Sequence, residues 1–345
     1  MSRSAARTRG ALSVAVIAAL GVAACGQLPI PSGAQRAGDS PSPARTSASP
    51  SASPIASDSP RPGSPARIVV ARLSVGLPGG LSRAVAVQLG SQVLICGGLG
   101  SAGTTGSILA LNLTTGRVRQ VGSLATAVHD AGGAVINGAG YLFGGGRSVA
   151  GSAIQRIDGS GASALVGALP AARADLAAAA VDGEIVIVGG GTPALADGRI
   201  LATSDGHDLR TIGRLLVPVR YPAVAVLDGL VYVIGGETPG GDTSAIQELD
   251  PATGRVRIAG HLPHPLSHAS ALVIGTTIVV AGGRSAGRAQ NAVLRFAART
   301  GSVSVVSRLP VPASDMAAVV VDGVGYLIGG ETSGPIASIV TISIP

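Results

Sequence analysis

A glycine doublet recurs six times along this chain at nearly constant spacing. The spacing is 45 to 47 residues, and the doublets begin at Gly97, Gly144, Gly189, Gly235, Gly282 and Gly329. A leucine stands at one fixed offset before each doublet, at Leu77, Leu124, Leu169, Leu215, Leu262 and Leu309. Two residue types kept in register through six copies predict six structural repeats of one unit.

Each repeat reads as four short strands separated by turn signals. In residues 221–262 an apolar segment runs to the turn Asp228-Gly229, and a second, Leu230–Ile234, ends on the doublet. A third surrounds Ile246, turns through residues 250–254 and returns as a fourth. Asp-Gly pairs are the residues that two-residue hairpin turns prefer. A period of this length with four strands predicts an all-β fold, a six-bladed β-propeller with four antiparallel strands per blade.

The last repeat is one strand short. Residues 315–344 supply three strand-like segments, whereas the segment Ile68–Leu77 aligns with the fourth strands of the other repeats. We expect this N-terminal strand to lie beside residues 338–344 and to complete the last blade, so that no sheet edge is left open. The folded domain is therefore predicted to span residues 67–345.

The repeats resemble the kelch family. The resemblance rests on the glycine pair, a Leu-Pro element before the next blade, and the turn Leu249-Asp250-Pro251-Ala252-Thr253-Gly254-Arg255-Val256. It covers nearly all of residues 68–345. Kelch repeats usually carry Tyr before this turn and Trp after it, whereas this repeat has Leu249 and Val256. We therefore expect aliphatic packing between the blades, which suits a chain with 2% aromatic residues and no Trp.

The N-terminus has the pattern of an export signal. Three arginines within the first nine residues precede the uncharged run Ala11–Val22, which is too short to span a membrane. The run ends in Val22-Ala23-Ala24-Cys25-Gly26, which resembles a bacterial lipobox. The resemblance, together with a composition rich in Ala, Gly and Arg but without Lys, implies an actinobacterial-type lipoprotein. Residues 1–24 are then the signal peptide and Cys25 the lipidated residue, although an ordinary secretory signal with a chance cysteine is the alternative.

Residues 25–66 are expected to be a disordered linker, because they are dense in Ser, Pro and Ala and nearly lack large apolar residues. Lipid on Cys25 would place the domain at the extracytoplasmic side of the cell membrane. Cys96 then has no disulfide partner, and we expect it to be a buried strand thiol. The net charge of +7 comes from scattered arginines with few aromatic residues, so no nucleic-acid partner is expected. We expect a monomer without a cofactor.

Polar residues recur at two positions of the repeat, in the connection that enters the first strand and in the one that leaves the second. These two connections open on the same face of a propeller, here named the mouth face. The candidate binding residues, the mouth ring, are Arg83, Asp130, Arg147, Asp175, Tyr221, Glu237, His268, Arg284, Asp315 and Glu331. Their neighbours His129, Arg173 and Arg220 belong to the same connections. Mixed charge favours a peptide, carbohydrate or zwitterionic ligand over a polyanion.

Two other interpretations of the mouth ring stay open. The charges can neutralise one another as a solvated rim without a ligand. Alternatively, some secreted six-bladed kelch proteins, which this chain resembles, epimerise N-acetylneuraminate. That resemblance implies Glu237 and Glu331 as general acid and base and Arg284 as an anion clamp. A metal site at His261 and His264 is disfavoured, because His-x-x-His on a strand is a weak signal. We predict a ligand- or protein-binding module, with the sugar-acid epimerase as the alternative.

Overall fold

The computed structural model describes residues 67–345. The predicted signal peptide, the lipidation site Cys25 and the linker 25–66 lie outside the described residues. Residues 67–345 form 32 β-strands, and no helix among them is long and apolar enough to cross a membrane. The prediction of an all-β fold is confirmed.

Each repeat builds an antiparallel sheet of four main strands, and the short β15 (Leu195–Ala196) adds a fifth strand to the third sheet. The first sheet contains β3 (Val85–Leu89), β4 (Gln92–Cys96), β7 (Ser107–Leu111) and β8 (Val118–Ser123), and the second contains β9 (Gly132–Ile136), β10 (Ala139–Phe143), β11 (Ala153–Ile157) and β12 (Ser163–Ala168). The third contains β13 (Ala174–Val181), β14 (Glu184–Thr192), β16 (Arg199–Thr203) and β17 (Arg210–Arg214), and the fourth contains β18 (Ala223–Leu227), β19 (Leu230–Ile234), β22 (Ala245–Asp250) and β23 (Arg255–His261). The fifth contains β24 (Ser270–Ile274), β25 (Thr277–Ala281), β28 (Ala292–Ala297) and β29 (Ser302–Arg308), and the sixth contains β30 (Ala317–Val321), β31 (Val324–Ile328), β32 (Ser338–Ser343) and β1 (Val69–Gly76).

Eight two-residue strands lie in the connections and were not expected from the sequence. They are β2 (Leu81–Ser82), β5 (Leu99–Gly100), β6 (Gly103–Thr104), β15 (Leu195–Ala196), β20 (Glu237–Thr238), β21 (Gly241–Asp242), β26 (Arg284–Ser285) and β27 (Arg288–Ala289). Most of them form small hairpins between the second and third strands of a sheet, such as β20 with β21. These hairpins extend the mouth face beyond the ends of the main strands.

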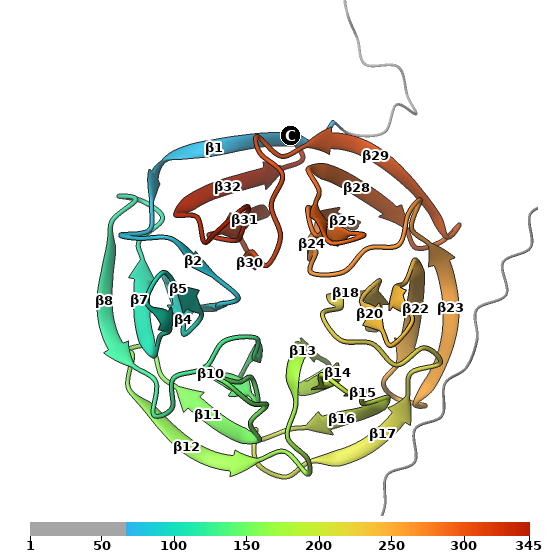
Figure 1. Cartoon of the computed structure of the whole chain (residues 1–345), viewed down its shortest axis with the longest axis horizontal. Coiled ribbons are helices and arrows are strands. Elements are labelled where there is room, and N and C mark those ends of the chain that lie inside the picture. Colours follow the sequence, from blue (N-terminus) through green and yellow to red (C-terminus); the bar gives the residue numbers. More distant parts are fainter. Residues whose placement is uncertain (1–66) are drawn as a thin grey trace, which may run out of the picture. The chain divides into compact units, whose positions relative to one another are not determined.

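The sixth sheet joins the two ends of the described chain. β1 pairs antiparallel with β32, with Val70 opposite Ile342 and Arg72 opposite Val340. The predicted neighbour of the N-terminal strand is therefore correct. Figure 1 shows the six sheets arranged around a common centre, with the first strands innermost and the fourth strands on the rim.

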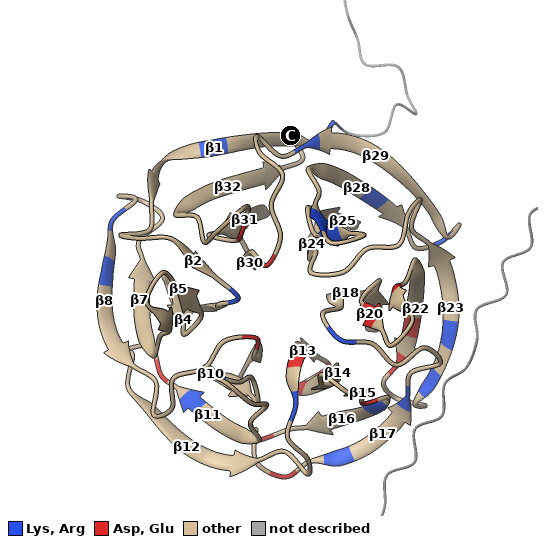
Figure 2. Ribbon diagram, viewed as in Figure 1, with Lys and Arg blue, Asp and Glu red and all other residues tan. Residues whose placement is uncertain are grey.

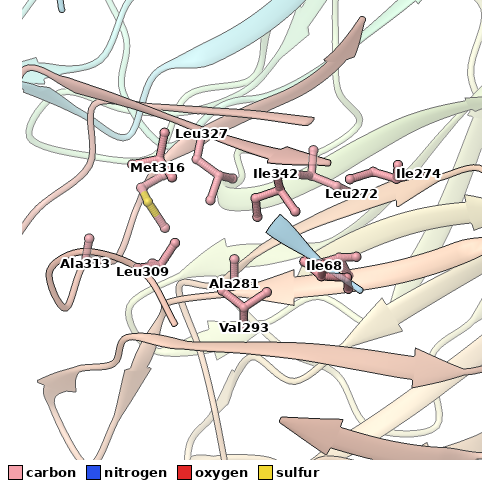
Figure 3. Packing of buried hydrophobic residues seen from close by; sticks show 12 residues of the cluster. Ile68, Leu272, Ile274, Ala281, Val293, Leu309, Ala313, Met316, Leu327 and Ile342 are labelled. Carbon is pink, nitrogen blue, oxygen red and sulfur yellow. The ribbon is translucent and has the colours of Figure 1, made fainter. Parts of the chain in front are cut away.

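Six apolar clusters hold neighbouring sheets together. Figure 3 shows the cluster between the fifth and sixth sheets, where Leu272 packs with Leu327, Ile342 and Ile68. Another cluster joins the sixth sheet to the first, so each sheet shares an apolar interface with both of its neighbours. The second strands are buried on both faces, which explains their continuous Val, Ile and Leu runs, whereas the fourth strands are largely exposed.

The glycine doublets make a close contact between sheets. Gly235 has a φ of 61°, and a Cβ there would lie 2.1 Å from the carbonyl oxygen of Leu266. The Gly236 N–H donates to that same oxygen at 2.8 Å, and the buried Leu262 packs against Gly235. The equivalent hydrogen bonds join Gly98 to Val128, Gly145 to Arg173, Gly190 to Val219, Gly283 to Ala313 and Gly330 to Leu81. All six leucines of the repeat are buried, as the register predicted.

Candidate functional site

Six residues of the mouth ring share a rare backbone conformation. Arg83, Asp130, Asp175, Tyr221, His268 and Asp315 all have φ between 50° and 64°. The N–H of each donates to the carbonyl of its counterpart in the preceding repeat at 2.8 to 3.1 Å, and the Arg83 N–H donates to Asp315 at 2.9 Å. The six bonds form a continuous circle around the axis. Such strained non-glycine residues persist where the surroundings enforce them, and they cluster at functional sites.

The circle surrounds a small axial cavity. These six residues and the residue after each of them line a space of about 110 Å³. Pockets that hold small organic ligands usually measure about 300–1,000 Å³. The axial cavity is therefore smaller than the usual pocket for a sugar-sized ligand.

Asp315 and Glu331 are neutralised by several partners. His268 Nδ1 lies 2.7 Å from Asp315, and Arg284 lies 3.2 Å from Asp315 and 2.9 Å from Glu331. Burial opposes the charge of Asp315, but the contact with His268 holds the pKa of this carboxyl below its usual value. Arg83 lies 3.5 Å from Glu331 and 4.0 Å from Asp315. This side of the ring is a closed ion-pair network.

An aromatic stack continues the network on the opposite side. The ring of Tyr221 stacks on His268 with 3.7 Å between centroids, and the Arg220 guanidinium lies 5.0 Å from the Tyr221 centroid. Arg220 Nε donates to Asp175 at 2.7 Å. Burial, with the nearby charges of Asp130 and Asp175, raises the pKa of Tyr221, so its hydroxyl stays protonated and interacts with Asp175.

Among the three acids that line the axial cavity, Asp130 is the least neutralised. Within residues 67–345 its one arginine partner is Arg83, at 3.1 Å, which it shares with Asp315 and Glu331, and His129 Nε2 lies 3.6 Å from it. Its side chain is 8% exposed. Burial, aided by the charges of Asp175 and Asp315 and opposed by Arg83, raises the pKa of Asp130 to about 7. A carboxyl that titrates near neutral pH inside a cleft can exchange protons with a bound molecule.

The raised pKa of Asp130 predicts a pH-dependent stability. The folded state binds the proton of Asp130 more tightly than the unfolded state does. The contribution of this proton to the free energy of unfolding is therefore complete below the unfolded pKa near 4, and it is lost as pH rises through 7. Relative to Asp130→Asn, the wild-type free energy of unfolding should fall by up to about 3 kcal/mol between about pH 4.5 and 8. Urea denaturation of both proteins across this range measures the difference. If the free energies of unfolding of the two proteins change with pH in the same way, the pKa of Asp130 is not raised in the folded protein.

A larger hollow lies on the mouth face beside the ring. It has a volume of about 380 Å³, within the range of ligand pockets, and its lining includes Arg83, His129, Asp130, Arg147, Val149, Asp175, Pro193, Arg220 and Tyr221. Arg147 is exposed and forms no ion pair within residues 67–345. Val149, which lines the hollow, is 78% exposed. Leu195 on β15 is 68% exposed and follows the lining residues Thr192 and Pro193 in the sequence. The hollow thus combines the guanidinium of Arg147 with the exposed apolar side chain of Val149.

The structure brings most of the mouth ring together. Eight of its members line the axial cavity or pair with a residue that does, and Arg147 joins them through the larger hollow. Glu237 stands apart, because it lines neither space, and its backbone pairs with Arg220 and with Asp242 of β21. Arg220, left out of the ring, belongs to it through its bond to Asp175.

Arg173 does not lie at the mouth. Its side chain is fully buried and pairs with Asp197 at 2.8 Å, so it is a core residue of the third repeat. His261 and His264 are both exposed and belong to no cluster of potential metal ligands among the described residues. The carboxylates and imidazole that do cluster, Asp205, His207 and Asp208, lie on an exposed turn.

Comparison with known proteins supports the fold. No protein-family model matches the chain, and no curated protein matches it. The solved structure of the protein YjhT is similar, with a TM-score of 0.67 and 16% sequence identity over 78% of this chain and 96% of that chain. At this identity the likeness extends to the fold alone, so residues 67–345 have an all-β, propeller-like fold.

Proposed function

We propose that residues 67–345 form a six-bladed kelch-like propeller, closed by β1, that acts as a ligand- or protein-binding module. Its support is the set of six sheets with six shared apolar interfaces and the continuous circle of hydrogen bonds at the axis. We further propose that lipid on Cys25 holds it at the extracytoplasmic side of the cell membrane, on the basis of the lipobox-like sequence.

The binding proposal rests on the hollow of about 380 Å³ on the mouth face. Arg147 offers an uncommitted guanidinium, which suits a bidentate contact to a carboxylate. Val149 offers apolar contact, and Asp130 and Asp175 can accept hydrogen bonds from hydroxyls or amides. A peptide segment or a carbohydrate that carries an acidic group fits this combination.

Charge reversal at Arg147 tests the proposal without disturbing the core. Arg147→Glu should lose at least about tenfold in affinity for any hit on a glycan array or an acidic peptide library, since a charge-assisted contact contributes about 1.5–3 kcal/mol. Arg156→Glu is the matched control, because Arg156 is also exposed but lies on β11, outside the hollow. If Arg147→Glu and Arg156→Glu bind equally well, the binding proposal is wrong and the mouth ring is a solvated rim without a ligand.

For the epimerase alternative, we assign the catalytic roles to other residues than those that the kelch resemblance implied. Arg284 and Glu331 pair with each other at 2.9 Å and Glu237 lies outside the hollow, so the trio implied by the kelch resemblance does not assemble. Asp130 is favoured as general base instead, because its pKa of about 7 suits proton transfer and Arg83 can hold an anion beside it. Interconversion of N-acetylneuraminate followed by NMR, and lost in Asp130→Asn, would support this activity over binding alone.

A further inference from the structure

Charge is unevenly distributed around the ring of sheets. Residues 67–129 contain five arginines and no acid, and residues 251–345 contain seven arginines against three acids. The two stretches together carry a net charge of +9. Residues 130–250 contain seven arginines against thirteen acids, a net charge of −6. Because the sheets follow one another around the ring in chain order, these stretches occupy opposite sides of it (Figure 2). The folded domain is an electrostatic dipole in the plane of the ring.

The acid-free sector presents three arginines on the rim. Arg72 lies on β1, Arg117 directly precedes β8 and Arg119 lies on it, and all three are exposed. None forms an ion pair with another residue of 67–345. The two strands are neighbours, since a Cβ at Gly116 would lie 2.8 Å from Val75 Cγ1. We name this area the β1–β8 surface.

The surface contains a polar hollow beside a partly apolar groove. The hollow, about 320 Å³, is lined by Arg117 and Arg119 with the side chains of Gln92, Asn112 and Thr115. This is a set of donors that suits a phosphate, because guanidinium groups bind its oxygens in pairs.

The groove beside it measures about 770 Å³ and contains Arg72, Leu73, Val75, Val311 and Ile336. β1 bulges here, because three residues lie between Arg72 and Gly76 whereas only Ile339 lies between their partners Val340 and Ser338 on β32. Val311 is 42% exposed. A phosphate-binding hollow next to an apolar groove matches the headgroup region of a phospholipid.

We propose that the β1–β8 surface docks on a membrane surface of anionic phospholipid headgroups. The described chain begins at Arg67, next to β1, so the 66 preceding residues connect to the domain on this same positive sector. A lipid anchor and a basic patch are each weak alone but hold a protein stably at a membrane together. The residues of this surface do not overlap with those that line the hollow of about 380 Å³, so the membrane contact and the proposed ligand site can be occupied at once.

The test measures binding to vesicles of phosphatidylcholine with about 30% phosphatidylglycerol, and to phosphatidylcholine alone. Every protein is the whole chain carrying Cys25→Ser, so that residues 1–66 contribute equally and no acyl chain does. The test variant is Arg72→Gln/Arg117→Gln/Arg119→Gln. The control, Arg156→Gln/Arg210→Gln/Arg214→Gln, removes the same charge from exposed positions on the acidic side.

The test variant should bind anionic vesicles on the order of 100-fold more weakly at low salt, since each arginine near the surface contributes about 1 kcal/mol. The control should bind like wild type, and an Arg→Lys version of the test variant should retain binding, which separates lost charge from misfolding. Equal affinities of the two triple variants would overturn the proposal. So would a wild-type chain that prefers a soluble polyanion such as dextran sulfate and shows no preference for anionic vesicles.

Discussion

A chain that begins at residue 78 should show no cooperative thermal unfolding, whereas a chain that begins at Arg67 should melt like the full protein. The deletion removes β1, and with it the pairing to β32 and two buried side chains. Ile68 packs in the cluster between the fifth and sixth sheets, and Leu77 in the cluster between the sixth and first. Losing one strand therefore opens both interfaces of the sixth sheet.

The expected loss exceeds the stability of an ordinary domain. Each buried apolar side chain contributes about 2–5 kcal/mol, each lost ladder bond about 1 kcal/mol, and total stability is about 5–15 kcal/mol. Circular dichroism during heating measures the result. Addition of a peptide of residues 67–77 should restore folding, because it supplies the missing strand. A truncated chain that melts normally would show that β1 is not needed to complete the ring.

The fold could be predicted because its signals act through short-range contacts. The glycine doublet and the leucine before the next repeat meet in one contact, as Gly235 and Leu262 do, so their fixed offset specifies the strand register directly. The same alignment of the repeats placed residues 68–77 with the fourth strands, and so predicted that β1 lies beside β32. The small hairpins of the mouth face, such as β20 with β21, were missed because two-residue strands carry no periodic pattern.

The position of the mouth ring was also predictable, but the pairing within it was not. Arg284 lies between Glu237 and Glu331 in ring order, and only the folded structure shows that it pairs with Glu331 and Asp315. The burial of Arg173 did leave a signal in the sequence. Its counterparts at the same repeat position are all apolar, Leu81, Val128, Val219, Leu266 and Ala313, which marks a core position.

The electrostatic dipole of the domain could not be predicted from the order of charged residues along the sequence. Along the chain the arginines look scattered, because each repeat carries a few. The ring brings the acid-free first repeat next to the sixth and places these two repeats opposite the fourth and the third, which belong to the acidic stretch 130–250. Charge patterns of this kind depend on which repeats become neighbours when the two ends meet.

Gly235→Ala should destabilise the domain by about 3–5 kcal/mol, against about 1 kcal/mol for Gly275→Ala. The two glycines have nearly the same φ, 61° and 59°, so a methyl group causes the same backbone strain at both. Nothing lies within 4 Å of a Cβ at Gly275, whereas a Cβ at Gly235 would lie 2.1 Å from the Leu266 carbonyl oxygen.

Relief of that overlap requires the connection into the fifth sheet to move away from Gly235. The movement breaks the bond from Gly236 to Leu266 and loosens Leu262 in the cluster between the fourth and fifth sheets. Urea denaturation of both variants measures the difference, which isolates the contact from the backbone conformation. If the two substitutions prove equally costly, the doublet serves only to turn the chain at the end of the second strand. A large difference means that each doublet is a point of attachment between neighbouring sheets.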